Sequence, residues 1–213
     1  GKVFWGEGMG AEIAKIGELC FNTSQTGYQE ILTDPSYSKQ IITFTFPHIG
    51  IVGINEIDIE SNKIHACGCI INQPISNQFN WRSTSNLDIF LKKNNTPCIT
   101  NIDTRQLTKL LANKGAMKAA IVNFKDLNDK NFENLKKSLK EWSGLKNLDL
   151  ASLVSTKEKY SSSEGIWNIK HNNYITKNSD KYNIACIDFG IKKNILRSLN
   201  QNLLSPTIFP SNS

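Results

Sequence analysis

A serine that follows an aspartate–proline pair has a hydroxyl that could contact a small ligand. Ser36 comes after Asp34 and Pro35. Proline fixes its own φ and biases the preceding residue toward extended backbone, so the Ser36 hydroxyl is presented at a defined place. A hydroxyl can donate and accept hydrogen bonds, so it can bind a polar group. The local residue types by themselves favour an ordinary turn serine over a binding residue.

The five cysteines are the next candidates for chemistry. Their number is odd and most lie in apolar, strand-like segments, so we expect free thiols in a reducing compartment rather than disulfides. Cys67 and Cys69 are one residue closer than the usual zinc-binding pair, and neither His65 nor a second pair completes a site. We therefore expect buried strand cysteines and no metal ion.

Two polar clusters are interpreted as structural. Asp103 precedes a helical pattern and Gln106 lies three residues further on, which is the spacing of a capping box. Helix capping is therefore favoured over a catalytic pair of Asp103 with Arg105. The Asp-Phe-Gly triplet at 188–190 matches a metal-binding motif of kinases, but the other kinase motifs are missing. We expect this triplet to turn the chain after a strand.

Strands and loops of the first half must position Ser36. Residues 40–46 alternate, with Ile42 and Phe44 on one side and Ile41 and Thr43 on the other, which predicts a strand. The preceding loop is therefore connected to a buried strand and presents Ser36 and Tyr37 at its tip. The remaining strands predicted from β-branched and aromatic residues are 3–5, 16–21, 64–71, 97–102 and 119–122.

Helical periodicity recurs three times in this half. Residues 85–93 form a short helical pattern, and a second pattern runs from the Asp103 cap to Gly115. The third runs over 128–142, where Asn128 or Asp129 can cap the helix. We expect an α+β architecture in which residues 1–170 form a β-rich layered (β/β/α) amino-terminal domain with its helices on one side.

After about residue 170 the pattern changes. Residues 171–182 are polar and rich in asparagine, and we interpret them as a linker. In 183–213, an apolar strand at 184–187, an amphipathic helix at 191–199 and a strand at 203–209 follow one another. That β-α-β order predicts a parallel sheet and the first unit of an α/β domain. One such unit cannot close a core by itself.

The composition excludes some classes of function. No apolar stretch reaches the roughly 20 residues of a membrane span, so we expect no membrane partner. The formal net charge is +6, which could suggest nucleic acid. The basic residues are dispersed, however, and the densest group lies on or beside one predicted helix: Lys136, Lys137, Lys140 and Lys146. A solvated helix face is the preferred interpretation, with no nucleic-acid partner.

The run of residues 21–53 closely resembles the amino-terminal domain of the carbamoyl-phosphate synthetase small subunit. The matching residues are those at 22–24, 26–37 and 47–50. The resemblance then continues over nearly the whole chain, at 101–105, 107–111, 114–116, 142–145, 149–151, 164–167, 188–190 and 192–197. A match that is this long and this rich in polar residues is specific.

The resemblance implies a glutaminase subunit. In this family a cysteine thiolate attacks the side-chain amide of L-glutamine, and the large subunit uses the released ammonia to make carbamoyl phosphate for arginine and pyrimidine biosynthesis. It implies that residues 183–213 begin a class I glutamine amidotransferase domain. The implied partners are the large subunit and L-glutamine. ATP and magnesium would be bound by the large subunit, so we expect no cofactor in this chain. The implied location is the cytoplasm.

The resemblance also assigns Ser36, because the serine after Asp-Pro lies at the glutamine site in this family. The catalytic groups are not recognisable. Cys69 fails the G-x-C-x-G pattern, Cys186 lies too early on a strand, and no His-x-Glu pair is present. We therefore expect a fragment that lacks the glutaminase core and is inactive alone. A non-catalytic protein-docking module is the alternative.

Overall fold

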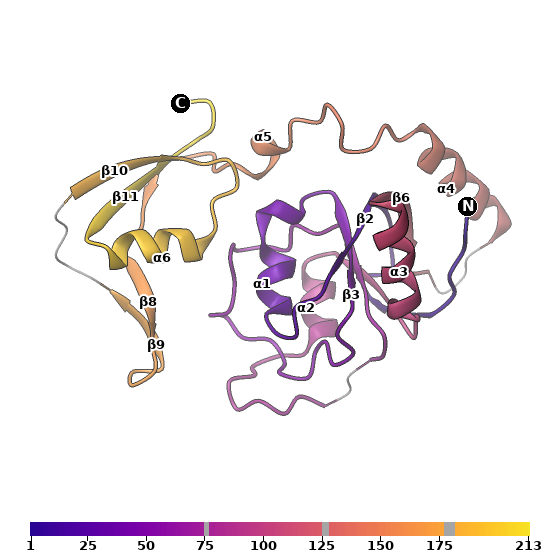
Figure 1. Cartoon of the computed structure of the whole chain (residues 1–213), viewed down its shortest axis with the longest axis horizontal. Coiled ribbons are helices and arrows are strands. Elements are labelled where there is room, and N and C mark those ends of the chain that lie inside the picture. The colour runs from indigo at the N-terminus through magenta and orange to yellow at the C-terminus, as the bar shows by residue number, and fades with distance from the viewer. Residues whose placement is uncertain (75–76, 125–127, 177–181) are drawn as a thin grey trace. The chain divides into compact units, whose positions relative to one another are not determined.

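The computed structural model describes residues 1–74, 77–124, 128–176 and 182–213 (Figure 1). The chain divides into two compact units, Gly1–Asn147 and Leu148–Ser213, and each is described by itself. Both units combine helices with strands, so the mixed α and β content that the sequence predicts is confirmed. The chain passes from the first unit to the second after residue 147, and the domain boundary near residue 170 stays a prediction.

A six-stranded sheet forms the centre of the first unit. Its strand order is β1-β5-β4-β3-β2-β6. Neighbours among the four inner strands run parallel, and the outer strands β1 and β6 pair antiparallel to them. The strands are β1 (Glu7–Gly10), β2 (Ala14–Asn22), β3 (Gln40–Phe44), β4 (Gly68–Ile70), β5 (Pro97–Thr100) and β6 (Met117–Val122).

Two cores lie on the two faces of this sheet. Ile42 and Phe44 of β3 belong to one core, with the helices α1 (Tyr28–Thr33) and α2 (Leu87–Lys93). Ile41, which points the opposite way, belongs to the other core, with α3 (Thr104–Lys114). Helices therefore cover both faces (Figure 1). The prediction that the helices lie on one side is wrong, because alternate residues of the inner strands are apolar in both directions.

The longer helices begin and end where the sequence predicts. The Asp103 carboxylate accepts a hydrogen bond from the Gln106 backbone N–H at 2.8 Å and so caps α3. Gly115, with a φ of 77°, ends this helix. Asn128 caps α4 (Asp129–Glu141) in the same way. Local capping residues therefore mark these boundaries.

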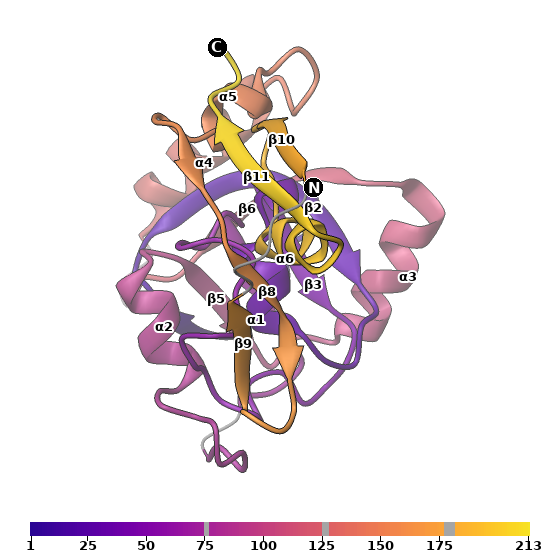
Figure 2. The same cartoon turned by 90° about the vertical axis from the view of Figure 1, so that its left-hand side faces the viewer.

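The second unit contains the predicted β-α-β arrangement. Strands β10 (Tyr182–Ile187) and β11 (Leu204–Phe209) are parallel neighbours and are joined through α6 (Lys193–Gln201), as Figure 2 shows. The short strand β7 (Tyr160–Ser161) pairs antiparallel with β11. A separate hairpin is formed by β8 (Glu164–Asn168) and β9 (Asn173–Thr176). The remaining helix of this unit's described residues is α5 (Leu150–Val154).

Three local predictions are wrong. Residues 3–5 lie outside any strand, and β1 begins at Glu7. The segment before Asp34, predicted as a loop, forms α1, whose six residues are too few for an amphipathic repeat to be visible. Residues 173–176, inside the predicted linker, form β9 because Tyr174 packs edge-on against Trp167 across the hairpin. Residues 177–181 of that linker lie outside the described residues.

Candidate functional site

Ser36 lies in a single 3₁₀ turn, Pro35–Tyr37, between α1 and β3. The Asp34 carboxylate accepts a hydrogen bond from the Ser36 backbone N–H at 2.9 Å. Asp34 and Pro35 are both buried, whereas Ser36 is exposed. Tyr37 is half-buried, and its hydroxyl accepts a hydrogen bond from the Asn22 side chain at 3.0 Å. Hydrogen bonds of Asp34 and Tyr37 thus hold the turn on both sides of Ser36. The predicted exposure of Ser36 at the tip of the turn is confirmed.

The polar side chains that precede this turn hold the neighbouring loop in place. The Tyr28 hydroxyl donates to the Gly53 carbonyl. The Gln29 amide donates to the Asn55 carbonyl and accepts from the Asn55 backbone N–H at 3.1 Å. Gln29 and Tyr28 are buried, so these bonds are shielded from water. The buried polar residues Tyr28 and Gln29 therefore serve the fold, whereas Ser36 is exposed.

Thr33, at the end of the same helix, forms a second set of hydrogen bonds to the neighbouring loop. Its hydroxyl donates to the Gln29 carbonyl at 2.9 Å and accepts from the Glu60 backbone N–H at 3.0 Å. Its carbonyl accepts from the Ser61 hydroxyl at 2.6 Å. Both ends of α1 are therefore bound to the loop of residues 50–61, and the Asp34–Ser36 turn begins from a fixed point.

An acidic pocket of about 240 Å³ opens between this helix and two loops. Arg82 forms an ion pair with Asp58 at 2.7 Å, and the Asn55 amide donates to the same carboxylate at 2.8 Å. Burial raises the pKa of Glu30, and the charges of Asp58 and Glu60 add to the rise while Arg82 opposes it. The pocket is lined by Thr26, Gly27, Tyr28, Gln29, Glu30, Val52, Gly53, Asn55, Asp58, Asn80 and Arg82.

Sequence reasoning did not identify this pocket. Its charged groups come from three segments that are separated by more than twenty residues, and no short motif joins Glu30, Asp58 and Arg82. The bonds from Tyr28 and Gln29 to the loop carbonyls bring these segments together. The pocket is therefore a product of tertiary structure.

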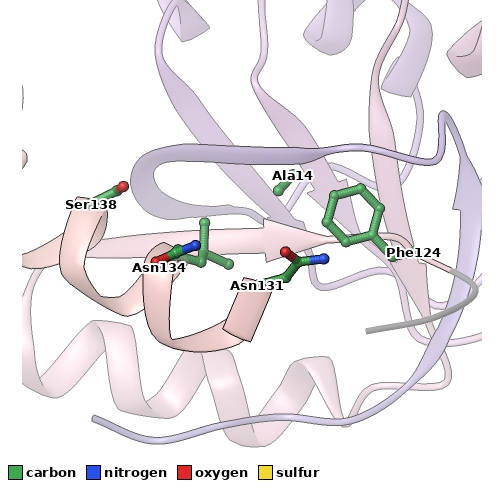
Figure 3. Close-up of a pocket in the computed structure, with 6 residues that line it drawn as sticks. Ala14, Phe124, Asn131, Asn134 and Ser138 are labelled. Carbon is green, nitrogen blue, oxygen red and sulfur yellow. The ribbon is translucent and has the colours of Figure 1, made fainter. Parts of the chain in front are cut away.

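A second cavity of about 300 Å³ lies between α4 and the edge of the sheet. Figure 3 shows Phe124 and Asn131 at one end of it and Ser138 at the other. Its lining is completed by Ala14, Asn134 and Leu135. These six side chains include amides and a hydroxyl but no titratable group, so this cavity offers hydrogen bonds and no acid–base chemistry.

Four of the five cysteine thiols are in surroundings that disfavour the nucleophilic thiolate. Cys69 and Cys98 are buried on the adjacent strands β4 and β5, as the sequence predicts. Burial raises the pKa of Cys20 to about 11 and also raises the pKa values of Cys67, Cys98 and Cys186. These four thiols stay protonated at neutral pH, and the thiolate is the form that attacks a carbonyl.

The other polar clusters have structural roles. The buried Asp188 carboxylate accepts from the backbone N–H groups of Gly190 and Ile191, each at 2.8 Å, and from that of Thr156 at 2.6 Å. It therefore shapes a turn, as the sequence predicts. His65, which is predicted within a strand, lies ahead of β4 and donates its backbone N–H to the Leu32 carbonyl at 3.0 Å.

The described residues provide neither a metal site nor a membrane-spanning helix. Within residues 1–74, 77–124, 128–176 and 182–213, no group of three or more His, Cys, Asp or Glu side chains is arranged to hold a metal ion. Over the same described part of the chain, no helix has the length and apolar character needed to cross a membrane.

Comparisons with known proteins agree with one another. Residues 1–121 match the family described as carbamoyl-phosphate synthase small chain, CPSase domain. Relatives named carbamoyl phosphate synthase small chain include one from Salmonella typhi, 44% identical over 213 residues, which cover 99% of this chain and 55% of the relative. One from Zymomonas mobilis is 43% identical over 199 residues, which cover 93% of this chain and 53% of the relative.

The fold and these matches define a synthase small-chain domain of mixed α and β structure. The chain belongs to the carbamoyl-phosphate synthase small chain family. It spans about half the length of the curated relatives that it matches.

Proposed function

We propose that this chain is the amino-terminal part of the glutamine-hydrolysing small subunit of a carbamoyl-phosphate synthetase. The observation that carries the proposal is the run of residues 21–53, which matches the family and folds into a turn that leaves Ser36 exposed. In the whole enzyme, glutamine is hydrolysed and ammonia passes to the large subunit. That subunit uses ATP and magnesium to make carbamoyl phosphate for arginine and pyrimidine biosynthesis in the cytoplasm.

The second unit supplies the start of the glutaminase domain in this proposal. The parallel pair β10 and β11 with α6 between them is the opening of an α/β sheet, and class I amidotransferases have such a sheet. The described cysteines with raised pKa values are poor nucleophiles, so the residues that cleave glutamine belong to the remainder of the subunit.

Within the complete enzyme, Ser36 contacts the glutamine substrate. The exposed hydroxyl can donate or accept one hydrogen bond, and the Asp34 carboxylate fixes the backbone that carries it. We expect Ser36→Ala, made in the complete small subunit bound to its large subunit, to raise the KM for glutamine by about tenfold, the effect of one lost hydrogen bond. Steady-state synthesis of carbamoyl phosphate with glutamine or with ammonia as nitrogen source measures this.

Ammonia-driven synthesis is the internal control, because it bypasses the glutamine site and should be unchanged. Ser24→Ala is the matched variant, since Ser24 is exposed in the same run and its observed hydrogen bond uses its backbone N–H. If glutamine kinetics are unaltered in Ser36→Ala, the substrate role is refuted. If the complete chain with its large subunit shows no use of glutamine, the alternative of a non-catalytic docking module replaces the proposal.

A further inference from the structure

Three apolar side chains on two adjacent segments of the first unit are exposed. Phe79 is 77% exposed, Trp81 is 78% exposed and Val52 is 44% exposed. The Phe79 backbone N–H donates to the Ile51 carbonyl at 2.9 Å, so the two segments that carry the patch lie side by side. We call Val52, Phe79 and Trp81 the aromatic patch. Large aromatic side chains exposed to this degree are typical of surfaces that become buried on binding.

The aromatic patch borders the acidic pocket. Val52 belongs to both, and Asn80, which stands between Phe79 and Trp81, also lines the pocket. The pocket volume of about 240 Å³ lies below the range of roughly 300–1,000 Å³ that is typical of sites for drug-sized ligands. One long side chain, inserted from a surface that covers the patch, suits this combination better than a free small molecule.

The charges of the pocket select the kind of side chain. Its lining carries two carboxylates, Glu30 and Asp58, and one guanidinium, Arg82, which is paired with Asp58 at 2.7 Å. The lining is therefore negative overall when both carboxylates are ionised. Glu30 is half-buried, and a cation that entered would relieve the repulsion between its carboxylate and that of Asp58.

We propose that the aromatic patch and the acidic pocket together form a docking surface for the large subunit, in which the pocket receives a Lys or Arg side chain and the patch covers apolar neighbours of that residue. The proposal rests on the proposed function for the identity of the partner. Charge complementarity argues for the cationic residue, and aromatic residues beside a paired arginine have the composition of an interface hot spot.

The test uses the complete small subunit and the large subunit, with the Kd measured by isothermal titration calorimetry at two salt concentrations. We expect Trp81→Ala to weaken binding by at least about tenfold, as truncation of an interface hot spot does. We expect Glu30→Gln to weaken binding as well and to reduce its dependence on salt, because one charge pair is lost. Both side chains can be replaced without opening a cavity in the core.

Matched controls are available in the same unit. Trp5→Ala removes a tryptophan that is 74% exposed outside the patch, and Glu7→Gln removes an exposed carboxylate outside the pocket. Weaker binding by both test variants, with both controls unchanged, supports the proposal. If the wild-type subunits bind and the test variants match their controls, the docking surface is wrong while the proposed function stands. If the wild-type subunits do not bind each other, the docking surface and the proposed function are both wrong.

Discussion

The folded chain disfavours the ionised form of the Glu30 carboxylate. Burial, followed by repulsion from Asp58 and Glu60, raises its pKa in the folded chain above its ordinary value. The stability that goes with such a raised pKa is fully present below the ordinary value and is lost as the pH rises through the raised one. Glu30→Gln keeps the neutral form at every pH. We therefore expect its free energy of unfolding to exceed that of the wild type at pH 7 and the difference to vanish below about pH 4.

Urea unfolding at a series of pH values measures this difference. Glu56→Gln is the control, since Glu56 is exposed on the neighbouring loop. A Glu30→Gln variant that is less stable than the wild type at pH 7 would contradict the argument. Glu30 would then lower the stability of the unbound subunit while contributing to its docking surface. Such a trade-off between stability and function is common in proteins.

Single residues differ in how far the sequence predicts their roles. The exposure of Ser36 depends on two adjacent residues, Asp34 and Pro35, so the sequence predicts it correctly. Its role in binding glutamine comes from the family and stays a prediction. The acidic pocket could not be predicted, because Glu30 and Arg82 come together only through hydrogen bonds between backbone and side chains of distant segments.

Arg197 joins three elements of the second unit. From α6 it forms an ion pair with Glu164 of β8 at 2.7 Å, and its guanidinium lies 3.5 Å from the ring centre of Tyr174 on β9. Its side chain is only 5% exposed. We expect Arg197→Met to destabilise this unit by about 2–3 kcal/mol, because a buried charged hydrogen bond and a cation–π contact are both lost. Arg197→Lys, which keeps the charge without the planar guanidinium, should cost less.

Hydrogen exchange followed by mass spectrometry measures this locally, in peptides from residues 164–201. Exchange in these peptides should rise in Arg197→Met, whereas peptides from the first unit should not change. Lys170→Met, at the exposed turn of the same hairpin, is the control. Exchange in Arg197→Met that equals the control would show that the ion pair and the ring contact are unimportant for this unit.

Elements with long repeats or clear caps are the ones that the sequence predicts. The helices α3 and α4 have both, and their bounds follow from Asp103, Gly115 and Asn128. Helix α1 has six residues and begins after Gly27, whose φ is 83°, so its local pattern resembles a turn. The strand predicted over 64–71 is reduced to β4, Gly68–Ile70, because pairing with β3 and β5 sets its limits and propensity does not.

For the whole molecule, we expect these 213 residues alone to release no ammonia from glutamine above background. The physical reason is that glutamine cleavage needs a thiolate with an adjacent base, and burial keeps the thiols of Cys20, Cys67, Cys98 and Cys186 protonated. A coupled assay for glutamate and ammonia measures it, with the complete small subunit as the positive control. Turnover by the 213-residue chain would refute the expectation.

The edges of the six-stranded sheet set the order in which the first unit forms on the ribosome. β1 pairs with β5, Glu7 opposite Thr100, and β2 pairs with β6, Ala14 opposite Val122. Synthesis at about 5–20 residues per second delays these pairings by roughly 5–20 seconds after β1 and β2 emerge. During that time β1 and β2 lack their partners β5 and β6, and unpaired strands are open to chaperones and to aggregation. The unit therefore completes its fold late, as one body, only after β6 has left the ribosome.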